Sequence, residues 1–579
     1  MRQRINVLIC MLAMLLTFPL LAVPALAQFT QRGKFSRTVF DPTMAVVSGP
    51  KPVLTTAGLR ATRSTGEEHT ASGAVRLPWY VTADGRRVAG SDGAETVQPL
   101  CHAVGGDDSL RNLLPPCWYE RVAGWEIVTF KKHMHYGFEL SLRPDELSRQ
   151  LDEIKSQGIQ AIEIFAPAWG HAAYNGLDTV DPFRIDPDLG TMQDFRRAVR
   201  MAHSKGLAVV VFINLGYVAH DAPAWIEAQR EKAASKDTGK VHWFLWSDKA
   251  GAPPPPAQED IYVSAKDRER DKAYWGWYWS SIAHTYFWSR WKANGPEGKV
   301  IPLPQANWGD PSWRQHAAKI VRFWMNTGID GMLVDAAPSL PYGTWSENRK
   351  YITNIVRSYG NVFMDPEGGR DPAWLTQAGY DVLHDYGLSY NPHANTWGKD
   401  AIKQAITSGD PSQIESHLRA YHDLVFYSGG VLYSHLLGFN DDPVKRHLQQ
   451  AVLVGIGDII VYGKQQGRPD AEEVANLKMK AENPALFPTA YRRQINTNDN
   501  KKYYAILKTA RDGSEHILAV YNFQPTAQAI TVDLSLVSTS GLQDLKTGAS
   551  IPRPDVFKPV RIQVPAYGYR FLDVLPPRG

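Results

Sequence analysis

The stretch PSWRQHAAKIVRFWMNTGIDGMLVD, residues 311–335, decides the fold class of this chain. Its first part, 311–327, has the apolar spacing of an amphipathic helix, and Gly328 marks the end of that helix. The apolar run 331–335 is short enough to be a buried strand. A helix that leads through glycine into a buried strand is typical of a parallel α/β fold.

The same unit occurs twice before this stretch. Helix 144–157 is followed, after Gly158, by the apolar strand 161–165, and helix 191–205 leads into strand 207–213. Strands that alternate with helices of this length predict βαβ units and a parallel sheet. We therefore expect an α/β protein built on a (β/α)8 TIM barrel.

Changes in composition and in the predicted pattern of helices and strands divide the chain into regions. Residues 1–27 read as a signal peptide, and 28–120 as an N-terminal irregular, partly β region whose role the sequence does not reveal. The barrel is expected at 121–485, interrupted by an inserted subdomain at about 226–305 that is rich in proline and tryptophan. Short alternating strands without helices predict a C-terminal β-sandwich at 486–579.

The first residues have the features of an exported protein. Arg2 and Arg4 precede a short apolar core, and Ala25-Leu26-Ala27 resembles a cleavage site. A membrane anchor is the competing interpretation, but the apolar core is short and contains a proline. We expect a mature chain from Gln28 in the periplasm or outside the cell, with no stable membrane insertion.

The cysteines agree with an oxidising compartment. The expected mature chain has two, Cys101 and Cys117, and a local disulfide between them is the favoured interpretation over two buried thiols. The formal net charge of +4, without a long basic run, gives no reason to expect nucleic acid as a partner. The oligomeric state cannot be predicted.

Carboxylates stand after three of the apolar strands. Asp335 ends the strand 331–335, Asp365 and Glu367 follow the apolar run that begins at Asn361, and Asp442 follows the strand at 430–433. Loops at the C-terminal ends of barrel strands form the rim of the active site. Glycoside cleavage needs one carboxylate at the anomeric carbon and one carboxylic acid for the leaving oxygen. Each aspartate taken alone could instead be a helix cap or a turn residue, but together they predict a glycosidase site.

Several motifs resemble the alpha-amylase superfamily of retaining glycosidases and transglycosylases. Gly176 to Asp181, followed by Ile185 to Phe195, is similar to the family pattern GYDVTDY…IDPELGTMEDF. Further similarity lies in His203-Ser204-Lys205-Gly206, in 303–308, in 328–331 and in 455–467. The resemblance covers about 121–579.

The resemblance implies roles for particular residues. Asp335 would be the nucleophile, Glu367 the general acid/base, and Asp442 the carboxylate that holds the sugar and stabilises the transition state. Four further residues would bind substrate: Asp178, Tyr217, Asn440 and Asp441. The implied partner is an oligosaccharide or polysaccharide with α-glucosidic linkages.

The chain also departs from the family pattern. Leu333 replaces an arginine two residues before the nucleophile, Leu177 replaces a tyrosine that stacks on sugar, and Tyr217 occupies a histidine position. An arginine would keep the nucleophile ionised, so either another cation substitutes, with Arg370 or Lys445 as the candidates, or the site is tuned for a substrate other than starch. Gly216 stands where many relatives have an asparagine associated with calcium. We expect no required metal and no cofactor.

Three alternatives remain open from the sequence. The site could transfer a glycosyl group to an acceptor sugar instead of water. The protein could be an amylase-like protein that has lost catalysis and only binds glycans, since several polar residues of the family's sugar-binding subsite are replaced. Within an active site, Asp365 could be the acid in place of Glu367, because the two lie two residues apart on one strand.

Overall fold

The computed structural model describes most of residues 117–576 and, before them, two short strands, β1 (Tyr80–Val81) and β2 (Arg87–Val88). The signal peptide, Cys101 and most of the N-terminal region lie outside the described residues. The gaps after residue 117 are 132–135, 172–175, 188–189, 254, 256–274, 295–299, 336, 338–344, 369–374, 376–377, 386, 390–399, 428 and 554–557.

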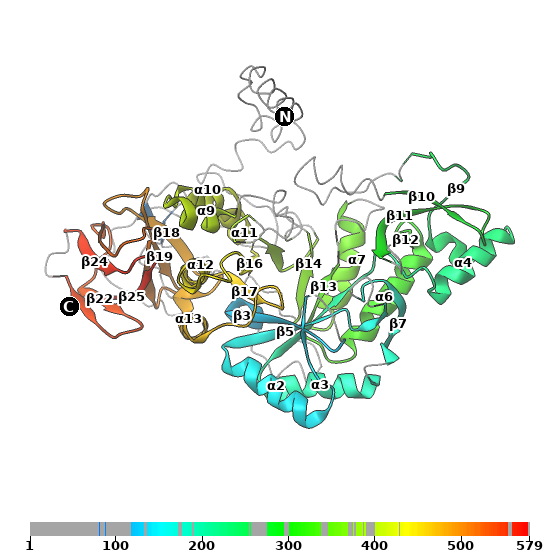
Figure 1. Ribbon diagram of the computed structural model, residues 1–579, viewed down its shortest axis with the longest axis horizontal. Helices are drawn as coiled ribbons and strands as arrows, with labels where there is room; N and C mark the ends of the chain where they lie inside the picture. The colour runs from blue at the N-terminus through cyan, green and yellow to red at the C-terminus, as the bar shows by residue number, and fades with distance from the viewer. Residues whose placement is uncertain are drawn as a thin grey trace, which may run out of the picture.

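Eight parallel strands form the central barrel (Figure 1). Their spatial order is β14-β13-β8-β5-β3-β17-β16-β15, with the short strand β4 (Phe138–Glu139) added beside β3. The ring closes between its end strands, where the Asp381 N–H donates to Met364 O at 3.0 Å. In chain order the strands are β3 (Gly124–Thr129), β5 (Ile159–Phe165), β8 (Ala208–Ile213), β13 (Gly331–Val334), β14 (Phe363–Pro366), β15 (Val382–His384), β16 (Val431–His435) and β17 (Ile459–Tyr462).

Helices cover the outside of the strands. Most of them lie in the connections between successive parallel strands, as in a βα barrel, whereas α13 follows the last barrel strand. Between β15 and β16 the connection is broken into several short helices instead of one. The helices are α2 (Pro144–Ser156), α3 (Met192–Ser204), α6 (Pro311–Met325), α7 (Trp345–Arg357), α9 (Ala401–Ser408), α10 (Ser412–His417), η11 (Leu418–His422), α11 (Asp423–Tyr427), α12 (Pro443–Ile456) and α13 (Ala471–Glu482).

The barrel interior is packed with side chains. Alternate residues of each strand point inward, and Trp125, Phe212, Leu333 and Phe363 form one buried cluster there. The short helix η5 (Trp118–Arg121) adds Trp118 to the same cluster. Glu163 of β5 is a buried polar side chain between the inward-facing Ala161 and Phe165, and Trp125 Nε1 donates to it.

The inserted region after β8 forms a small antiparallel sheet at the right of Figure 1. Helix α4 (Pro223–Ala233) precedes it. The sheet contains β9 (Trp246–Ser247), β10 (Gly276–Ser280), β11 (Thr285–Asn294) and β12 (Val300–Pro304). The chain then returns to the barrel at α6, so this sheet stands beside the end of β8.

The C-terminal region is an antiparallel β-sandwich on the opposite side of the barrel (Figure 1). A six-stranded sheet, in the order β18-β19-β20-β25-β22-β23, packs against the pair β21 and β24 through one apolar core. The strands are β18 (Tyr491–Ile495), β19 (Tyr503–Thr509), β20 (His516–Asn522), β21 (Gln528–Val532), β22 (Gly541–Asp544), β23 (Ser550–Pro552), β24 (Val560–Val564) and β25 (Tyr569–Leu575).

The predicted fold class is confirmed: an α/β barrel with an inserted subdomain and a C-terminal β-sandwich. The predicted helices at 144–157, 191–205 and 311–327 are α2, α3 and α6, each shorter by one to two residues at its ends. Within the described residues, no helix is both long enough and apolar enough to cross a membrane. Cys117 is disulfide-bonded.

Candidate active site

Asp335 and Glu367 lie together at the C-terminal ends of neighbouring strands. β13 and β14 are parallel and pair Leu333 with Asp365. Just beyond the strands, the Asp335 N–H donates to Ile213 O at 2.8 Å, and the Glu367 N–H donates to Val334 O at 3.1 Å. The two side-chain carboxyl groups are hydrogen-bonded to each other. The extended backbone therefore carries both carboxyls to one point on the rim.

The two carboxyls cannot both be ionised at low cost. Asp335 is 7% exposed, and burial together with the charge of Glu367 raises the pKa of Asp335 well above its usual range. A hydrogen bond from Tyr217 acts in the opposite direction by favouring the carboxylate. Two carboxyls in contact share a proton over a wide pH range.

Tyr217 holds Asp335 from the β8 side. Its hydroxyl donates to Asp335 Oδ2 at 2.9 Å, and the side chain is 3% exposed. Asn214 shapes the loop before it: Asn214 Oδ1 accepts the Gly216 N–H at 2.7 Å, and Asn214 Nδ2 donates to Tyr217 O at 2.9 Å. The loop thus fixes the tyrosine before any ligand binds.

The segment that returns from the inserted sheet supports this loop. Gln305 forms an isolated antiparallel bridge with Tyr217, and the Ala306 N–H donates to Gly216 O at 2.9 Å. Trp308 Nε1 donates to Leu215 O at 3.0 Å. The motif at 303–308 therefore stabilises the Tyr217 loop through these contacts.

A polar layer lies inside the barrel among these strand ends. His384 Nε2 lies 2.8 Å from Asp365 Oδ2, and both side chains are buried. Tyr433 stacks on His384 with ring centroids 4.7 Å apart, and its hydroxyl donates to Glu163 Oε2 at 2.9 Å. Burial raises the pKa of Glu163 to about 7. Trp125 Nε1 donates to the same carboxyl oxygen at 3.1 Å.

Strand β16 ends at His435, on the same rim. Gln466 Nε2 lies 3.1 Å from His435 Nδ1. Burial and the nearby His384 lower the pKa of His435 to about 3. This imidazole is neutral at neutral pH, so it offers hydrogen bonds but no charge.

Tyr136 is an exposed aromatic side chain beside the carboxyl pair. The side chain is 38% exposed, and the charges of Glu367 and Asp335 both act on its hydroxyl. Its ring packs on Phe165, at 5.4 Å between centroids, and Phe165 stacks on Phe212 at 4.7 Å. The Lys464 N–H donates to Tyr136 O at 2.9 Å, which holds the backbone.

The Asp178 carboxylate is already hydrogen-bonded to another residue, His171. Its Oδ1 accepts the His171 N–H at 2.9 Å, and its Oδ2 lies 2.8 Å from His171 Nδ1. The other ring nitrogen, Nε2, lies 3.2 Å from Asp221 Oδ2. Asp178 is 1% exposed, so in this structure it clamps its loop, and a sugar hydroxyl would have to displace His171.

The three remaining predicted residues lie at the start of α12. Asp442 caps that helix by accepting the Lys445 N–H at 3.3 Å, and Lys445 Nζ lies 2.8 Å from Asp442 Oδ2. Asn440 binds Arg446 Nη1 at 2.9 Å and Gln465 O at 3.1 Å. Asp441 is exposed.

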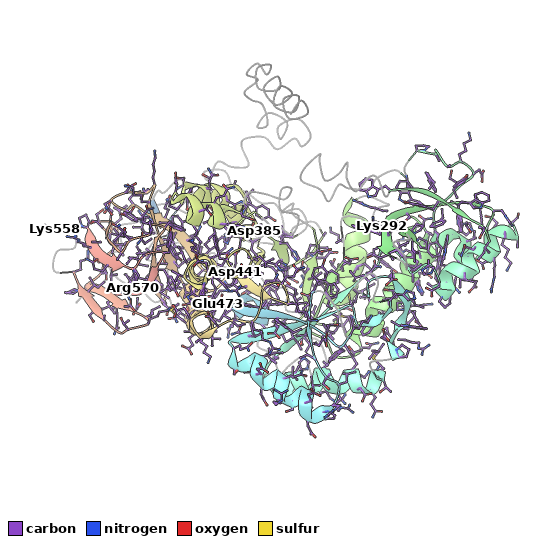
Figure 2. All side chains as sticks on the ribbon, viewed as in Figure 1. Lys292, Asp385, Asp441, Glu473, Lys558 and Arg570 are labelled. Carbon is purple, nitrogen blue, oxygen red and sulfur yellow. The ribbon has the colours of Figure 1, made fainter. Side chains whose placement is uncertain are left out.

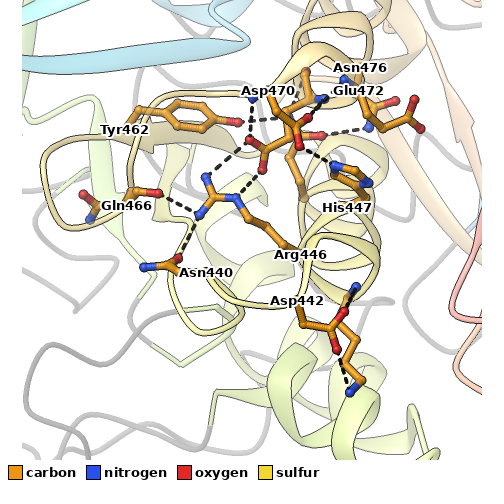
Figure 3. A network of polar contacts seen from close by, with 12 residues as sticks. Asn440, Asp442, Arg446, His447, Tyr462, Gln466, Asp470, Glu472 and Asn476 are labelled. Atoms are coloured by element: carbon orange, nitrogen blue, oxygen red, sulfur yellow. Dashed lines mark hydrogen bonds and ion pairs between the residues drawn. The ribbon is translucent and has the colours of Figure 1, made fainter.

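Figure 3 shows the guanidinium of Arg446 turned toward Asn440 and Gln466, while Asp442 lies apart at the beginning of the helix. In Figure 2, the labels of Asp441 and of Lys292 in the inserted sheet are well apart in this view. Among the contacts of the described residues, none joins Asp442 to Asp335 or Glu367. The structure therefore brings together two of the three predicted carboxylates.

Comparisons with known proteins agree with this geometry. Residues 145–364 match the family model of the alpha-amylase catalytic domain. Over these residues the chain is similar to the catalytic domains of the alpha-amylase superfamily. The family-model match includes Asp335 and ends before Glu367.

Curated superfamily relatives match over part of their length. Trehalose synthase from Thermus thermophilus is 25% identical over 250 residues, which is 42% of this chain and 23% of that protein. Oligo-1,6-glucosidase from Parageobacillus thermoglucosidasius is 22% identical over 278 residues, 46% of this chain and 43% of that protein. The matches thus cover less than half of either relative.

Solved structures of the superfamily share the fold. An alpha-amylase from H. orenii superposes with a TM-score of 0.59 at 15% identity, covering 78% of this chain and 99% of that one. The trehalulose synthase MutB from Pseudomonas mesoacidophila MX-45 gives a TM-score of 0.57 at 14% identity, with 79% and 99% covered. These likenesses concern the fold.

Relative to the superfamily pattern, the structure shows what occupies the altered positions. Leu333 is 1% exposed and belongs to the apolar cluster in the barrel. Lys445, one suggested substitute for the arginine, pairs with Asp442 instead, and Arg370 lies outside the described residues. Gly216 offers no side-chain oxygen, and the absence of a required metal stays a prediction.

Sequence reasoning missed several residues of the site. Tyr136, Asn214, His384 and His435 were not singled out. The one available signal was a polar side chain at the end of an apolar run, which Asn214 and His435 both show. His384 ends a strand of three residues, too short for any periodicity to reveal its face.

Proposed function

We propose that this protein is a retaining α-glycoside hydrolase or transglycosylase that acts on a glucose-containing oligosaccharide or polysaccharide. One observation carries the proposal: the Asp335 and Glu367 carboxyls are hydrogen-bonded at the C-terminal ends of adjacent barrel strands. Similarity to the superfamily supports it, because the matching relatives include a glucosidase and a synthase.

The geometry supports retention of configuration. Inverting glycosidases hold their carboxyls about 6.5–9.5 Å apart to admit a water molecule, whereas retaining enzymes hold them about 5–5.5 Å apart. Two carboxyls that interact at hydrogen-bond range fit the shorter separation. A bound sugar would separate them slightly and occupy the position between them.

The reaction proceeds in two displacements. Glu367 gives its proton to the glycosidic oxygen while an Asp335 oxygen bonds to the anomeric carbon and the carbon–oxygen bond to the leaving group breaks. Glu367, now a carboxylate, takes a proton from water or from an acceptor hydroxyl, whose oxygen attacks the same carbon and releases Asp335. Tyr217 orients the attacking carboxylate throughout.

The structure favours Glu367 over Asp365 as the acid. Glu367 is partly exposed and contacts Asp335, whereas Asp365 is fully buried and bonded to His384. We expect azide to restore turnover of an activated glycoside by the variant that lacks the true acid. Rescue of Asp365→Asn, but not of Glu367→Gln, would reverse the assignment.

The decisive experiment is product release by the full chain from α-linked gluco-oligosaccharides and from glucans of several linkages. NMR should show an α-anomer as the first product, and Asp335→Asn should abolish release. A β-anomer would contradict the retaining mechanism. No turnover on a broad panel by a folded protein would favour the glycan-binding alternative.

The location outside the cytoplasm is part of the proposal. The expected signal peptide supports it, and the disulfide at Cys117 suits an oxidising compartment. In a bacterial host the protein should appear in the periplasmic or secreted fraction with Gln28 as its first residue. Cytoplasmic protein that retains residues 1–27 would contradict this.

A further inference from the structure

His384 is a buried histidine inside the barrel that the two-carboxyl mechanism does not use. It ends β15, is 3% exposed, and lies 2.8 Å from Asp365 on the neighbouring strand. Asp365 and Glu367 are two residues apart on an extended chain, so they share one face. The His384–Asp365 pair therefore lies directly below the catalytic pair.

A cation is needed at this level of the barrel. The catalytic pair with one shared proton carries one negative charge in a buried place, and burial disfavours that charge. Superfamily relatives would supply an arginine from the position of Leu333, which is apolar here. The replacement must therefore come from another strand.

His384 has the surroundings of a charged imidazole. Asp365 raises its pKa, as do Glu367 and Glu163, against the effect of burial. The titratable groups that face it are Asp365 of β14, Glu367 just after that strand, Glu163 of β5, and Tyr433 and His435 of β16. His435 is neutral at neutral pH, so it does not compete for this role.

We propose that the His384 imidazolium, anchored by Asp365, is the positioning residue that supplies the positive charge beneath Asp335 and Glu367 in place of the family arginine. The inference rests on the proposed glycosidase function. His384 acts through electrostatics on the singly charged pair and does not touch the sugar. It stabilises that pair against taking up a second proton.

The first test is the pH profile of kcat/KM for His384→Gln and Asp365→Asn. In His384→Gln the acid limb should move to higher pH, by about 1 unit or more, because the pair loses a nearby cation. In Asp365→Asn the limb should move less, because the negative charge of Asp365 is removed as well. His422→Asn is the matched control, since His422 is also buried and lies 2.8 Å from Asp458. An acid limb that stays in place in His384→Gln would overturn the proposal.

The second test does not need turnover. NMR of histidine labelled at Cε1, assigned by comparison with His384→Gln, should show His384 protonated at pH 7 in the wild type. Its titration midpoint should fall in the double variant Asp335→Asn/Glu367→Gln, because the single negative charge of the carboxyl pair is then removed. A neutral His384 at pH 7, or a midpoint unaffected by that double variant, would overturn the inference.

The two tests separate the two proposals. If the wild type shows no turnover on any substrate while His384 titrates as expected, the proposed function fails and the electrostatic coupling stands. If turnover is present and lost in Asp335→Asn, but His384 is neutral, the function stands and the role of His384 is wrong.

Discussion

At the scale of single residues, Tyr217 shows how this site differs from its relatives. The resemblance implied a sugar-binding role at a histidine position. The structure instead directs the hydroxyl to Asp335 at 2.9 Å, within a loop fixed by Asn214. A phenol that donates to a carboxylate favours the ionised form, which is the form that attacks the anomeric carbon.

Tyr217→Phe should therefore lower kcat while the fold is retained. Hydrogen bonds to charged groups contribute about 1.5–3 kcal/mol, so kcat should fall by about ten- to a hundredfold. Steady-state kinetics and thermal unfolding measure the two effects. Tyr278→Phe, in the inserted sheet, is the control and should be neutral; an unchanged kcat in Tyr217→Phe would show that the bond is dispensable.

Tyr136 is the second residue whose role can be tested directly. Its exposed ring beside the carboxyl pair is placed to stack on a sugar, a role that Leu177 cannot perform. Tyr136→Ala should raise KM about two- to tenfold, since aromatic contacts contribute about 0.5–1.5 kcal/mol beyond their area. Tyr136→Phe should keep the wild-type KM. Equal losses in both variants would assign the effect to the hydroxyl instead.

At the scale of secondary-structure elements, family motifs turn out to shape helix ends. Thr191 Oγ1 accepts the Asp194 N–H at 3.2 Å, and Asp194 Oδ2 accepts the Thr191 N–H at 2.9 Å. This capping box begins α3 and lies within the longest family-like segment. The motif therefore specifies where a helix starts as much as it specifies a binding site.

The N-terminus of α12 gives an element-scale prediction. Asp442 caps this helix, and its hydrogen bond to Lys445 lowers the pKa of Asp442. Asp442→Ala should cost about 1 kcal/mol of unfolding free energy, the usual effect of losing a cap. Its kcat should change far less than in Asp335→Asn. Denaturant unfolding and kinetics test this, with Asp441→Ala as the neighbouring control.

A loss of turnover in Asp442→Ala as large as that in Asp335→Asn would contradict the helix-cap interpretation. It would mean that the loop after β16 moves Asp442 into the site when substrate binds. The transition-state role implied by the family resemblance would then be restored.

At the scale of the whole molecule, two buried lysines hold backbone carbonyls, Lys508 between the C-terminal sandwich and the barrel and Lys480 within the barrel. Lys508 of β19 donates to Ile456 O at the end of α12, at 2.7 Å, and to Ala490 O at 3.0 Å. Lys480 of α13 donates to Val122 O at 3.1 Å and to Asp458 O at 2.6 Å. Burial lowers the pKa of each lysine to about 7.

These lysines make the stability of the protein depend on pH. Between about pH 7 and the unfolded pKa of about 10.4, the unfolded chain binds the proton and the folded chain does not. The unfolding free energy should therefore rise with pH across this window, by up to about 1.4 kcal/mol per unit for each lysine, and be flat below it.

Denaturant unfolding from pH 7 to pH 10 measures this dependence. Lys508→Met should flatten the curve, because it removes one of the two titrating groups. The exposed Lys501→Met is the control and should leave the slope unchanged. A wild-type curve without a rise would show that these lysines remain charged when buried.

The sequence by itself determined the βα alternation, and with it the barrel, because apolar periodicity and glycine at helix ends are local signals. It also placed Asp335 and Glu367, since each directly follows a buried strand in a fold whose strand ends converge. Local signals could not place Asp442, because four residues between His435 and Asn440 carry it away from the strand end and into a helix cap.

Only the tertiary structure decided which polar side chains face one another inside the barrel. His384 and Asp365 come from different strands, and Tyr217 reaches Asp335 across 118 positions of sequence. Such pairings depend on strand register and on barrel closure, which arise from long-range contacts. The apolar and polar pattern of one strand therefore does not reveal which residue of another strand its polar side chain will meet.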